Sequence, residues 1–331
     1  MVTAPLPVGT ESNDPERPST PRQDVLCVRE TVTAADGVVR ITLARPDGAR
    51  LPDWSPGAHI DILLPNGLTR QYSLCGDRWD AHRFTIGVLR EPQSRGGSRF
   101  IHEQLAVGDV VGFGGPRNNF RLDPAPSYLF VAGGIGITPL LPMMDQASRV
   151  GADWSLLYVG RSRRTMGFLN ELERFRTHVS VVATDESGRP DLIDLLSQTT
   201  GSKIYACGPE SLLGAIRAAT SEQPAGWVRM ERFSSSTLIA SARSDFDVEL
   251  ARSGRVVRVS QDTTIVEALR RAGTDILTSC GEGICGTCET SVLSGAIDHR
   301  DSLLDDEERR LGTCMFPCVS RSLGDRLVLD L

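Results

Sequence analysis

Four cysteines near the C-terminus constrain the fold of this chain more than any other feature. Four residues separate Cys280 from Cys285, two separate Cys285 from Cys288, and twenty-nine separate Cys288 from Cys318. This spacing, C-x4-C-x2-C with a distant fourth cysteine, is typical of a plant-type [2Fe–2S] cluster. Two irons need four thiolates, so one loop must wrap three sulfurs around the cluster. The glycines of that loop allow its tight turns, because glycine tolerates positive φ. We therefore predict a centre that carries one electron at a time.

The spacing leaves the metal group and its fourth ligand open to alternatives. A structural zinc site would use C-x2-C pairs, and Cys285 with Cys288 is the one such pair in this sequence. The cluster is therefore the better interpretation. Cys314, four residues before Cys318, competes with it for the role of fourth ligand. The remaining thiols are scattered along the chain, at Cys27, Cys75 and Cys207.

Composition excludes several classes of protein. The chain has 331 residues, enough for two or three domains, and 40% of them are hydrophobic. A net charge of −6 provides no basic surface for nucleic acid. The N-terminus is polar and proline-rich, without the apolar region of a secretory signal, and no apolar run is long enough to span a membrane. We expect a cytoplasmic monomer, without contact to nucleic acid or membrane, whose thiols stay reduced.

The pattern of apolar residues and turns divides the chain into three folded regions. Residues 1–24 are rich in proline and polar side chains and are expected to be a disordered tail. Short strands broken by Pro-Gly turns fill 25–123 and predict an all-β barrel or sandwich. Strands alternate with helices over 124–232, which predicts an α/β domain with a parallel sheet. After a small, polar linker at 233–245, residues 246–331 read as a small α+β domain that holds the cysteine loop.

Two short motifs in the all-β region are candidates for binding a phosphorylated cofactor. Arg70-Gln-Tyr72-Ser73 lies on a predicted strand, and by itself it reads as a plain barrel strand with an aromatic residue. Gly96-Gly97-Ser98 precedes a predicted helix, where backbone N–H groups can bind phosphate. The strand before this triplet adds further candidates, namely Ile86, Val88 and Arg90.

Three motifs in the α/β region are candidates for binding a nucleotide. Gly133-Gly134-Ile-Gly136-Ile-Thr138-Pro139 runs from a buried strand into a helix, without the glycine offsets of a Rossmann fingerprint. Cys207-Gly208-Pro209 ends a later strand of the parallel sheet, the edge where ligands bind in such folds. Phe233 ends the last predicted strand, and a role in the core would explain it equally well.

Together these motifs resemble the ferredoxin–NADP⁺ reductase superfamily, whose R-x-Y-S strand holds a flavin. The resemblance implies that Arg70 contacts the flavin phosphate, Tyr72 packs on the isoalloxazine ring and Ser73 hydrogen-bonds near its N5 atom. It places the 133–139 turn at the pyrophosphate of the nicotinamide cofactor. It also places Cys207 near the path of the hydride, and an aromatic residue such as Phe233 over the flavin ring.

The order of the domains resembles one family in particular. A flavin-binding β-barrel, then a nicotinamide domain, then a C-terminal ferredoxin domain of the β-grasp type is the order of the phthalate dioxygenase reductase family. That family uses FMN, and it places its last cysteine before a V-S-R-like segment. Cys318-Val-Ser-Arg321 matches this segment, so the resemblance favours Cys318 over Cys314 as the fourth ligand.

The choice of nicotinamide cofactor depends on the end of the second strand of the α/β domain. Arg161 lies there and could bind the 2′-phosphate of NADPH. Asp185 ends the next strand, where a carboxylate would accept ribose hydroxyls or repel that phosphate. The resemblance implies NADH, which we prefer, with NADPH as the alternative.

We therefore expect an electron-transfer reductase that passes electrons from NADH through FMN and the [2Fe–2S] cluster to an oxygenase. The resemblance implies a Rieske-type partner that hydroxylates or O-demethylates aromatic compounds, with a cytochrome P450 as an alternative partner. Two other functions remain: a standalone flavin or ferric reductase, and a non-enzymatic redox-sensing electron carrier. Acidic residues near the cluster loop, including Glu282, are expected to form the exposed surface that steers the partner.

Overall fold

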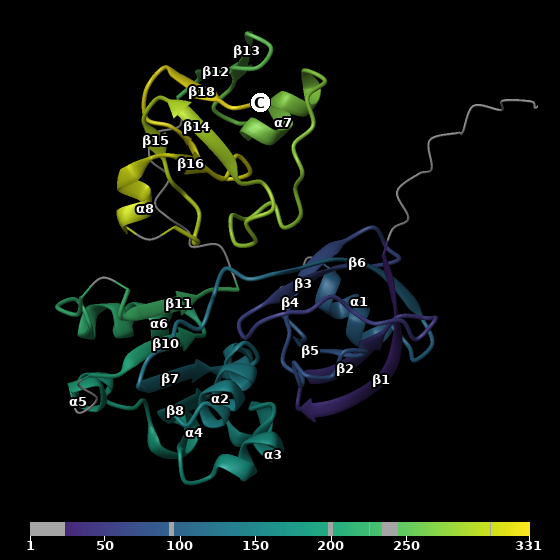
Figure 1. The fold of residues 1–331 in the computed structure, drawn as a ribbon, viewed down its shortest axis with the longest axis vertical. Coiled ribbons are helices and arrows are strands. Elements are labelled where there is room, and N and C mark those ends of the chain that lie inside the picture. Colours follow the sequence, from purple (N-terminus) through teal and green to yellow (C-terminus); the bar gives the residue numbers. More distant parts are fainter. Residues whose placement is uncertain (1–23, 93–95, 198–200, 225, 234–243, 305) are drawn as a thin grey trace, which may run out of the picture.

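The computed structural model describes residues 24–92, 96–197, 201–224, 226–233, 244–304 and 306–331 (Figure 1). Most of the expected N-terminal tail and of the 233–245 linker lies outside the described residues. The described strands form one six-stranded, two five-stranded and one two-stranded sheet.

The first region is a six-stranded antiparallel sheet with the order β4-β3-β6-β1-β2-β5. Its buried face carries alternate apolar residues of each strand, among them Leu26, Ile60 and Val88. The edge strands of the sheet are β4 and β5. A single isolated bridge joins Leu74, the residue after β4, to Ile86 of β5. The antiparallel all-β domain is therefore confirmed, whereas a closed barrel is not. Its elements are β1 (Val25–Ala35), β2 (Val38–Ala44), β3 (His59–Leu63), β4 (Thr69–Ser73), β5 (Phe84–Leu89), α1 (Gly97–Glu103) and β6 (Val110–Arg117).

The second region is a five-stranded parallel sheet with the order β11-β10-β7-β8-β9. Separate apolar cores cover its two faces, one with Met143 and Met144 of α2 and the other with Leu213 and Ile216 of α6. This arrangement places the carboxyl ends of β7, β10 and β11 at one edge. The strands are β7 (Ser127–Gly133), β8 (Asp153–Gly160), β9 (Val179–Ala183), β10 (Lys203–Cys207) and β11 (Val228–Glu231). The helices are η1 (Gly134–Ile137), α2 (Leu140–Arg149), η2 (Arg163–Thr165), α3 (Leu169–Leu172), η3 (Glu173–Phe175), α4 (Thr184–Ser187), α5 (Leu192–Ser197) and α6 (Glu210–Ala219).

The third region combines a mixed sheet, β13-β12-β18-β14-β16, with the short pair β15-β17. Helix α7 packs its apolar face on that sheet and begins with a capping box, in which Thr264 Oγ1 accepts from Glu267 N at 3.1 Å. The elements are β12 (Phe246–Leu250), β13 (Arg255–Val259), α7 (Ile265–Arg271), β14 (Thr290–Ser294), β15 (Ile297–Asp298), α8 (Asp306–Leu311), β16 (Cys314–Met315), β17 (Arg321–Ser322) and β18 (Arg326–Leu329).

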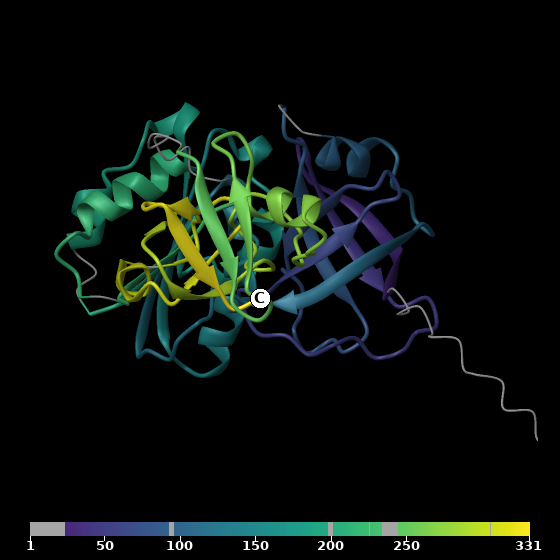
Figure 2. The same ribbon diagram turned by 90° about the horizontal axis from the view of Figure 1, so that it is seen from above.

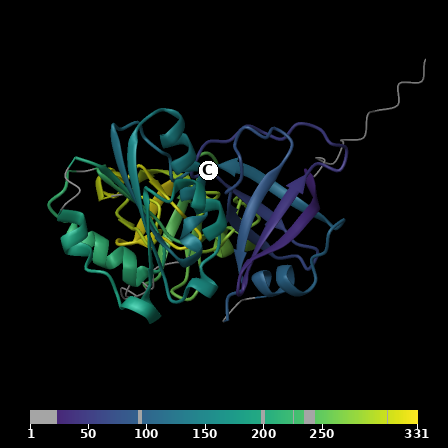
Figure 3. The same ribbon diagram turned by 90° about the horizontal axis from the view of Figure 1, so that it is seen from below.

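The third domain lies over the junction of the other two, which sit side by side (Figures 1, 2 and 3). The loop that contains the first three cluster cysteines, residues 280–288 and hereafter the cluster loop, faces this junction. Within the described parts of the chain, no helix has the length and apolar character needed to cross a bilayer.

Candidate functional site

A cavity of about 430 Å³ lies where the three domains meet. Strand β4, the turn after β7, Phe233 beyond the end of β11 and the cluster loop all contribute to its wall. Residues far apart in the sequence therefore face one space. Seven of the side chains predicted as site residues line it, namely Arg70, Tyr72, Ser73, Ser98, Thr138, Phe233 and Cys280.

Arg70 lies against the start of α1 because residue 97 is a glycine. A Cβ atom at Gly97 would lie 2.5 Å from Arg70 Nε, so any larger residue would displace the guanidinium. Gly96 precedes it with a φ of 97°, a left-handed value that glycine adopts without strain. Ser98 is buried, and its Oγ accepts from Glu91 N at 3.2 Å. These residues form a preorganised cationic corner that fits a phosphate group.

Tyr72 and Ser73 give the cavity an aromatic wall and a hydroxyl. Burial raises the pKa of the Tyr72 phenol well above its ordinary value, so it stays neutral. Ser73 is 5% exposed. A neutral, apolar wall with one polar group suits a planar ring system such as a flavin.

The structure places three of the predicted cofactor-binding residues away from the cavity. Ile86 and Val88 point into the core of the first domain, because alternate residues of a strand face opposite sides. Arg90 is exposed and pairs with Glu103. The residues of β5 that line the cavity are Gly87 and Leu89.

The glycine turn after β7 packs directly on the end of β10. A Cβ atom at Gly136 would lie 2.2 Å from the carbonyl oxygen of Cys207, and one at Gly208 would lie 2.9 Å from Gly133 Cα. The two strand ends can approach this closely only because neither position carries a side chain. Thr138, at the end of the same turn, is 2% exposed and reaches the cavity.

Gly134, Pro139 and Pro209 lie where the chain enters the helices η1, α2 and α6. Gly134 has a φ of 54° and begins η1. Pro139 stands immediately before α2 and Pro209 immediately before α6, where the missing N–H of proline costs no helical hydrogen bond. Both helices therefore begin beside the candidate nucleotide site.

Cys207 is fully buried, and its partner is a residue to which the sequence motifs assigned no role. Its Sγ lies 3.9 Å from Oε2 of Glu231, at the end of the neighbouring strand β11. Burial raises the pKa of Glu231 to about 8, and burial together with the adjacent carboxyl raises the pKa of Cys207. The sequence signal that could have identified Glu231 was its place: an acidic residue at the C-terminal end of a strand of the parallel sheet. Phe233, two residues later, is 40% exposed and lines the cavity.

The four predicted cluster ligands lie together. Hydrogen bonds from Cys285 and Cys318 lower the pKa of Cys280, and a hydrogen bond from Cys318 lowers that of Cys288. These thiols stand in for the thiolates that would bind iron. Three glycines of the cluster loop have positive φ values, of 69°, 68° and 78° at positions 281, 283 and 286.

Backbone groups of the loop point at the sulfurs. Glu282 N donates to Cys280 Sγ at 3.2 Å, and Thr287 N donates to Cys285 Sγ at 3.4 Å. Such donors favour the charged form of a thiolate. The donor set and the loop conformation therefore fit a [2Fe–2S] cluster. No group of three or more His, Cys, Asp or Glu side chains suited to a single metal ion was found among the described residues.

The sequence raised two expectations about this loop, one about Cys314 as a competing ligand and one about Glu282 as a docking residue. Cys314 lies on β16, paired with Ser291, and its pKa is raised by burial rather than by another ligand sulfur. This position favours Cys318 as the fourth ligand. Glu282, expected on an exposed docking surface, instead lines the central cavity with Cys280 and Ile284. Glu282 is half-buried there, and its role in docking a partner stays a prediction.

The first domain supplies contacts to the loop that the sequence motifs did not reveal. His59 of β3 is 5% exposed, and its ring lies against the backbone of Cys285. Burial, followed by the nearby Arg117, lowers the pKa of His59 to about 4, so its ring is neutral at pH 7. No local signal marks such a residue, because its neighbour is 226 positions away in sequence.

The residues expected to choose the nicotinamide cofactor are adjacent. Asp185 N donates to the carbonyl of Arg161 at 3.0 Å. Glu186, the next residue, pairs with Arg163 at 3.3 Å. Both carboxylates belong to α4, at the end of β9.

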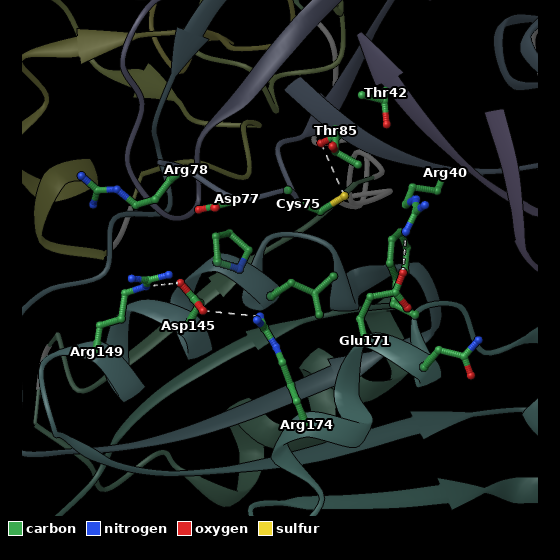
Figure 4. A pocket seen from close by; sticks show the side chains of 15 residues that line it. Arg40, Thr42, Cys75, Asp77, Arg78, Thr85, Asp145, Arg149, Glu171 and Arg174 are labelled. Atoms are coloured by element: carbon green, nitrogen blue, oxygen red, sulfur yellow. Dashed lines mark hydrogen bonds and ion pairs between the residues drawn. The ribbon is translucent and has the colours of Figure 1, made fainter. Parts of the chain in front are cut away.

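A second cavity, of about 400 Å³, lies between the first and second domains (Figure 4). Arg40 and Glu171 pair across it at 3.0 Å. Asp145 accepts from Arg149 at 2.7 Å and pairs with Arg174 at 3.4 Å. The carboxylates of Glu171 and Asp145 thus neutralise the paired arginines that line this second cavity. We interpret the cavity as a junction between the two domains that is held by ion pairs.

Comparisons with known proteins match this organisation. Residues 248–322 match the model of the 2Fe-2S iron-sulfur cluster binding domain. The phenoxybenzoate dioxygenase subunit beta of Ectopseudomonas oleovorans is 42% identical over 90% of this chain and 94% of its own. Phthalate dioxygenase reductase of Burkholderia cepacia is 36% identical over 95% of this chain and 100% of its own.

Solved structures of two related proteins superpose on most of this chain. A structure of phthalate dioxygenase reductase superposes with a TM-score of 0.68 and 36% identity, covering 93% of this chain and 97% of the other. An intact type IV self-sufficient cytochrome P450 monooxygenase superposes with a TM-score of 0.86 and 46% identity over 93% of this chain. This chain spans 41% of that longer protein. The identity over nearly the whole chain, together with the matching iron-sulfur domain and the structural superposition, shows that this protein is an oxidoreductase of the phthalate dioxygenase reductase family.

Proposed function

We propose that this protein takes electrons from NADH, passes them through FMN to its [2Fe–2S] cluster and delivers them to an oxygenase. The observation that carries the proposal is the central cavity. One continuous space is lined by Arg70 and Tyr72 of the first domain, by Thr138 of the second and by Cys280 of the cluster loop. A flavin in this space would touch both its electron donor and its electron acceptor.

The residues of the cavity have distinct proposed roles. Arg70 would bind the flavin phosphate, Tyr72 would pack on the ring and Ser73 would donate a hydrogen bond near N5. Phe233 would cover the opposite ring face until the nicotinamide replaces it. When bound, the flavin supplies the conversion of a two-electron hydride into single electrons, and the protein supplies orientation and exclusion of water.

The nicotinamide cofactor would bind along the carboxyl edge of the parallel sheet. Gly133, Gly134 and Pro139 shape the turn that would receive the pyrophosphate, and Gly208 and Pro209 shape the turn beside the nicotinamide. NADH is favoured over NADPH because the backbone of Asp185 is hydrogen-bonded to Arg161, and a carboxylate at this position would repel a 2′-phosphate. Kinetics with both cofactors test this point, and an equal kcat/KM for NADPH would contradict it.

FMN is favoured over FAD because Arg70 and the Gly96-Gly97-Ser98 turn together form a corner for one terminal phosphate. Heat release of the cofactor followed by chromatography tests this proposal. Recovery of FAD would refute it.

The partner is proposed to be a Rieske-type oxygenase acting on an aromatic compound. Relatives carry names such as phenoxybenzoate dioxygenase subunit and toluene-4-sulfonate monooxygenase reductase subunit. A P450 partner is the second candidate, since the self-sufficient P450 contains a matching segment. We further propose a cytoplasmic monomer.

Anaerobic titration with NADH tests the central proposal. Both the flavin and the cluster absorbance should bleach, and reconstitution with candidate oxygenases should then support product formation. A flavin that bleaches while the cluster stays oxidised would contradict the electron path. Cytochrome c reduction at full rate after loss of the cluster would instead indicate a standalone flavin reductase.

A further inference from the structure

Asn119 joins the first domain to the backbone of the cluster loop. Its Nδ2 donates to the carbonyl oxygen of Cys285 at 3.1 Å. Cys285 itself is 2% exposed, whereas Asn119 is exposed, so the hydrogen bond is partly buried. Asn119 belongs to the segment between β6 and β7, more than 160 positions from its partner.

The neighbours of Asn119 hold it in place. Asn118 Nδ2 donates to Ser55 Oγ at 2.7 Å and to Pro56 O at 2.9 Å, and its Oδ1 accepts from Phe120 N at 3.0 Å. Phe120 is 3% exposed and packs against Tyr205 of the second domain, with ring centroids 5.6 Å apart. The amide of Asn119 is therefore presented from a segment fixed on both sides.

The cluster loop is shaped to receive this side chain. A Cβ atom at Gly286 would lie 3.0 Å from Asn119 Nδ2, tighter than ordinary contacts. The φ of Gly286 is 78°, which also favours glycine. The absence of a side chain at position 286 thus serves both the turn and the close approach of Asn119.

A second, independent contact lies on the same side of the loop. Gln71 Nε2 donates to Ser279 Oγ at 3.4 Å, next to the first cluster cysteine. The same nitrogen donates to Asp61 Oδ1 at 2.9 Å, and Asp61 Oδ2 accepts from Arg117 at 2.7 Å. One contact is therefore made just before the first residue of the loop, at Ser279, and the other within the loop, at Cys285.

We propose that Asn119 is a positioning residue for electron transfer: it holds the cluster loop against the flavin-binding domain, so that the cluster lies at the edge of the central cavity. The inference rests on the proposed function. In the step concerned, flavin reduced by the hydride of NADH loses one electron and one iron of the cluster gains it, with no further reactant. The rate of such a step falls steeply with distance, so a loosened loop slows it.

The test compares Asn119→Asp and Asn119→Ala with the unmodified holoprotein. Aspartate keeps the shape of asparagine but replaces the donor with an acceptor that faces a carbonyl oxygen. Loss of one such hydrogen bond changes the ratio of docked to undocked loop by roughly fivefold. Anaerobic stopped-flow absorbance with NADH should show unchanged flavin reduction and a slower cluster reduction in both variants, by up to roughly fivefold for alanine and by more for aspartate. Asn170→Asp, at an exposed position beside the other cavity, is the matched control and should change neither phase.

Hydrogen–deuterium exchange supplies a readout that needs no turnover. In the oxidised protein without NADH, backbone amides of residues 279–290 should exchange faster in both Asn119 variants than in the Asn170 control. Unchanged exchange, or faster exchange with an unchanged rate of cluster reduction, would overturn the proposal. Equal slowing of flavin and cluster reduction would also overturn it, because Asn119 would then act on the flavin site. If the cluster of the unmodified protein fails to bleach with NADH, the proposed function fails, and the exchange comparison still decides whether Asn119 holds the loop.

Discussion

Cys207 Sγ and Glu231 Oε2 lie 3.9 Å apart at the carboxyl ends of two neighbouring parallel strands. The register of the sheet pairs these two residues directly, so their side chains leave the same face. Burial raises the pKa of Glu231 to about 8, which leaves its carboxyl neutral at pH 7. A group that titrates near working pH beside the proposed nicotinamide site can influence hydride transfer.

We predict that hydride transfer from NADH accelerates as the pH rises through about 8. Below that pH the carboxyl of Glu231 is neutral, and above it the carboxylate stabilises the positive charge that develops on the nicotinamide ring. The expected gain is roughly tenfold, and Glu231→Gln should abolish it because glutamine cannot ionise. Stopped-flow flavin reduction between about pH 6 and 9 measures it.

The exposed carboxylate of Glu210 provides a control for the pH profile. It pairs with Arg232 at 3.2 Å and with Arg217 at 3.7 Å. Glu210→Gln should keep the rise near pH 8. A Glu231→Gln variant with the unmodified profile would contradict the assignment. Because the folded-state pKa of Glu231 is raised, its contribution to stability is present below the ordinary carboxyl pKa and is lost as the pH rises through about 8.

Gly136→Ala should destabilise the second domain by about 2 kcal/mol and weaken NADH binding. The added Cβ would lie 2.2 Å from the Cys207 carbonyl oxygen, so the turn must move away from β10. Gly214→Ala on α6 has nothing within 4 Å and should stabilise the helix by about 0.5–1 kcal/mol. Thermal unfolding and NADH titration of both variants measure these effects. Equal unfolding temperatures for the two would disprove the steric explanation.

Cys318→Ser should remove the visible absorbance of the cluster, whereas Cys314→Ser should retain it. The Cys318 thiol donates to Cys280 and Cys288, while Cys314 lies on β16 apart from these sulfurs. Absorbance spectra and iron content of the purified variants measure the outcome. Retention of a full cluster by Cys318→Ser with its loss in Cys314→Ser would reverse the ligand assignment.

Arg321→Leu should destabilise the third domain by about 3 kcal/mol. The side chain of Arg321 is 6% exposed and donates to the carbonyls of Thr263 at 2.7 Å, Ser260 at 3.0 Å and Ser244 at 3.1 Å. Its removal buries an apolar side chain in place of the guanidinium and leaves these partly buried carbonyls without their charged donor. The temperature at which the cluster bleaches measures the loss.

Arg258→Leu is the matched control for Arg321. Arg258 is exposed and pairs with Asp247 at 3.0 Å and with Asp245 at 3.7 Å. Exposed ion pairs contribute at most about 1 kcal/mol, so the cluster should bleach close to the unmodified temperature. A larger effect at Arg258 than at Arg321 would contradict the burial argument.

Strand alternation explains why the side chains of Ile86 and Val88 lie away from the cavity. Ile86 and Val88 were predicted to bind the cofactor because they are apolar and precede Gly96. In the structure the apolar positions of β5 form the core, and the cavity receives Gly87 and Leu89. A sequence shows that two faces alternate, but it does not show which face meets a ligand.

The sequence by itself predicted the cysteine ligand set and the succession of an all-β region, an α/β region and a small α+β region. These features are local: cysteine spacing fits a cluster of fixed size, and strand or helix periods repeat within a few residues. Only the tertiary structure decided which surface of the cluster loop is covered. Glu282 faces the cavity, and Asn119 reaches Cys285, because three domains pack together at one point. Contacts between segments more than 160 residues apart depend on that packing, and no local pattern encodes it.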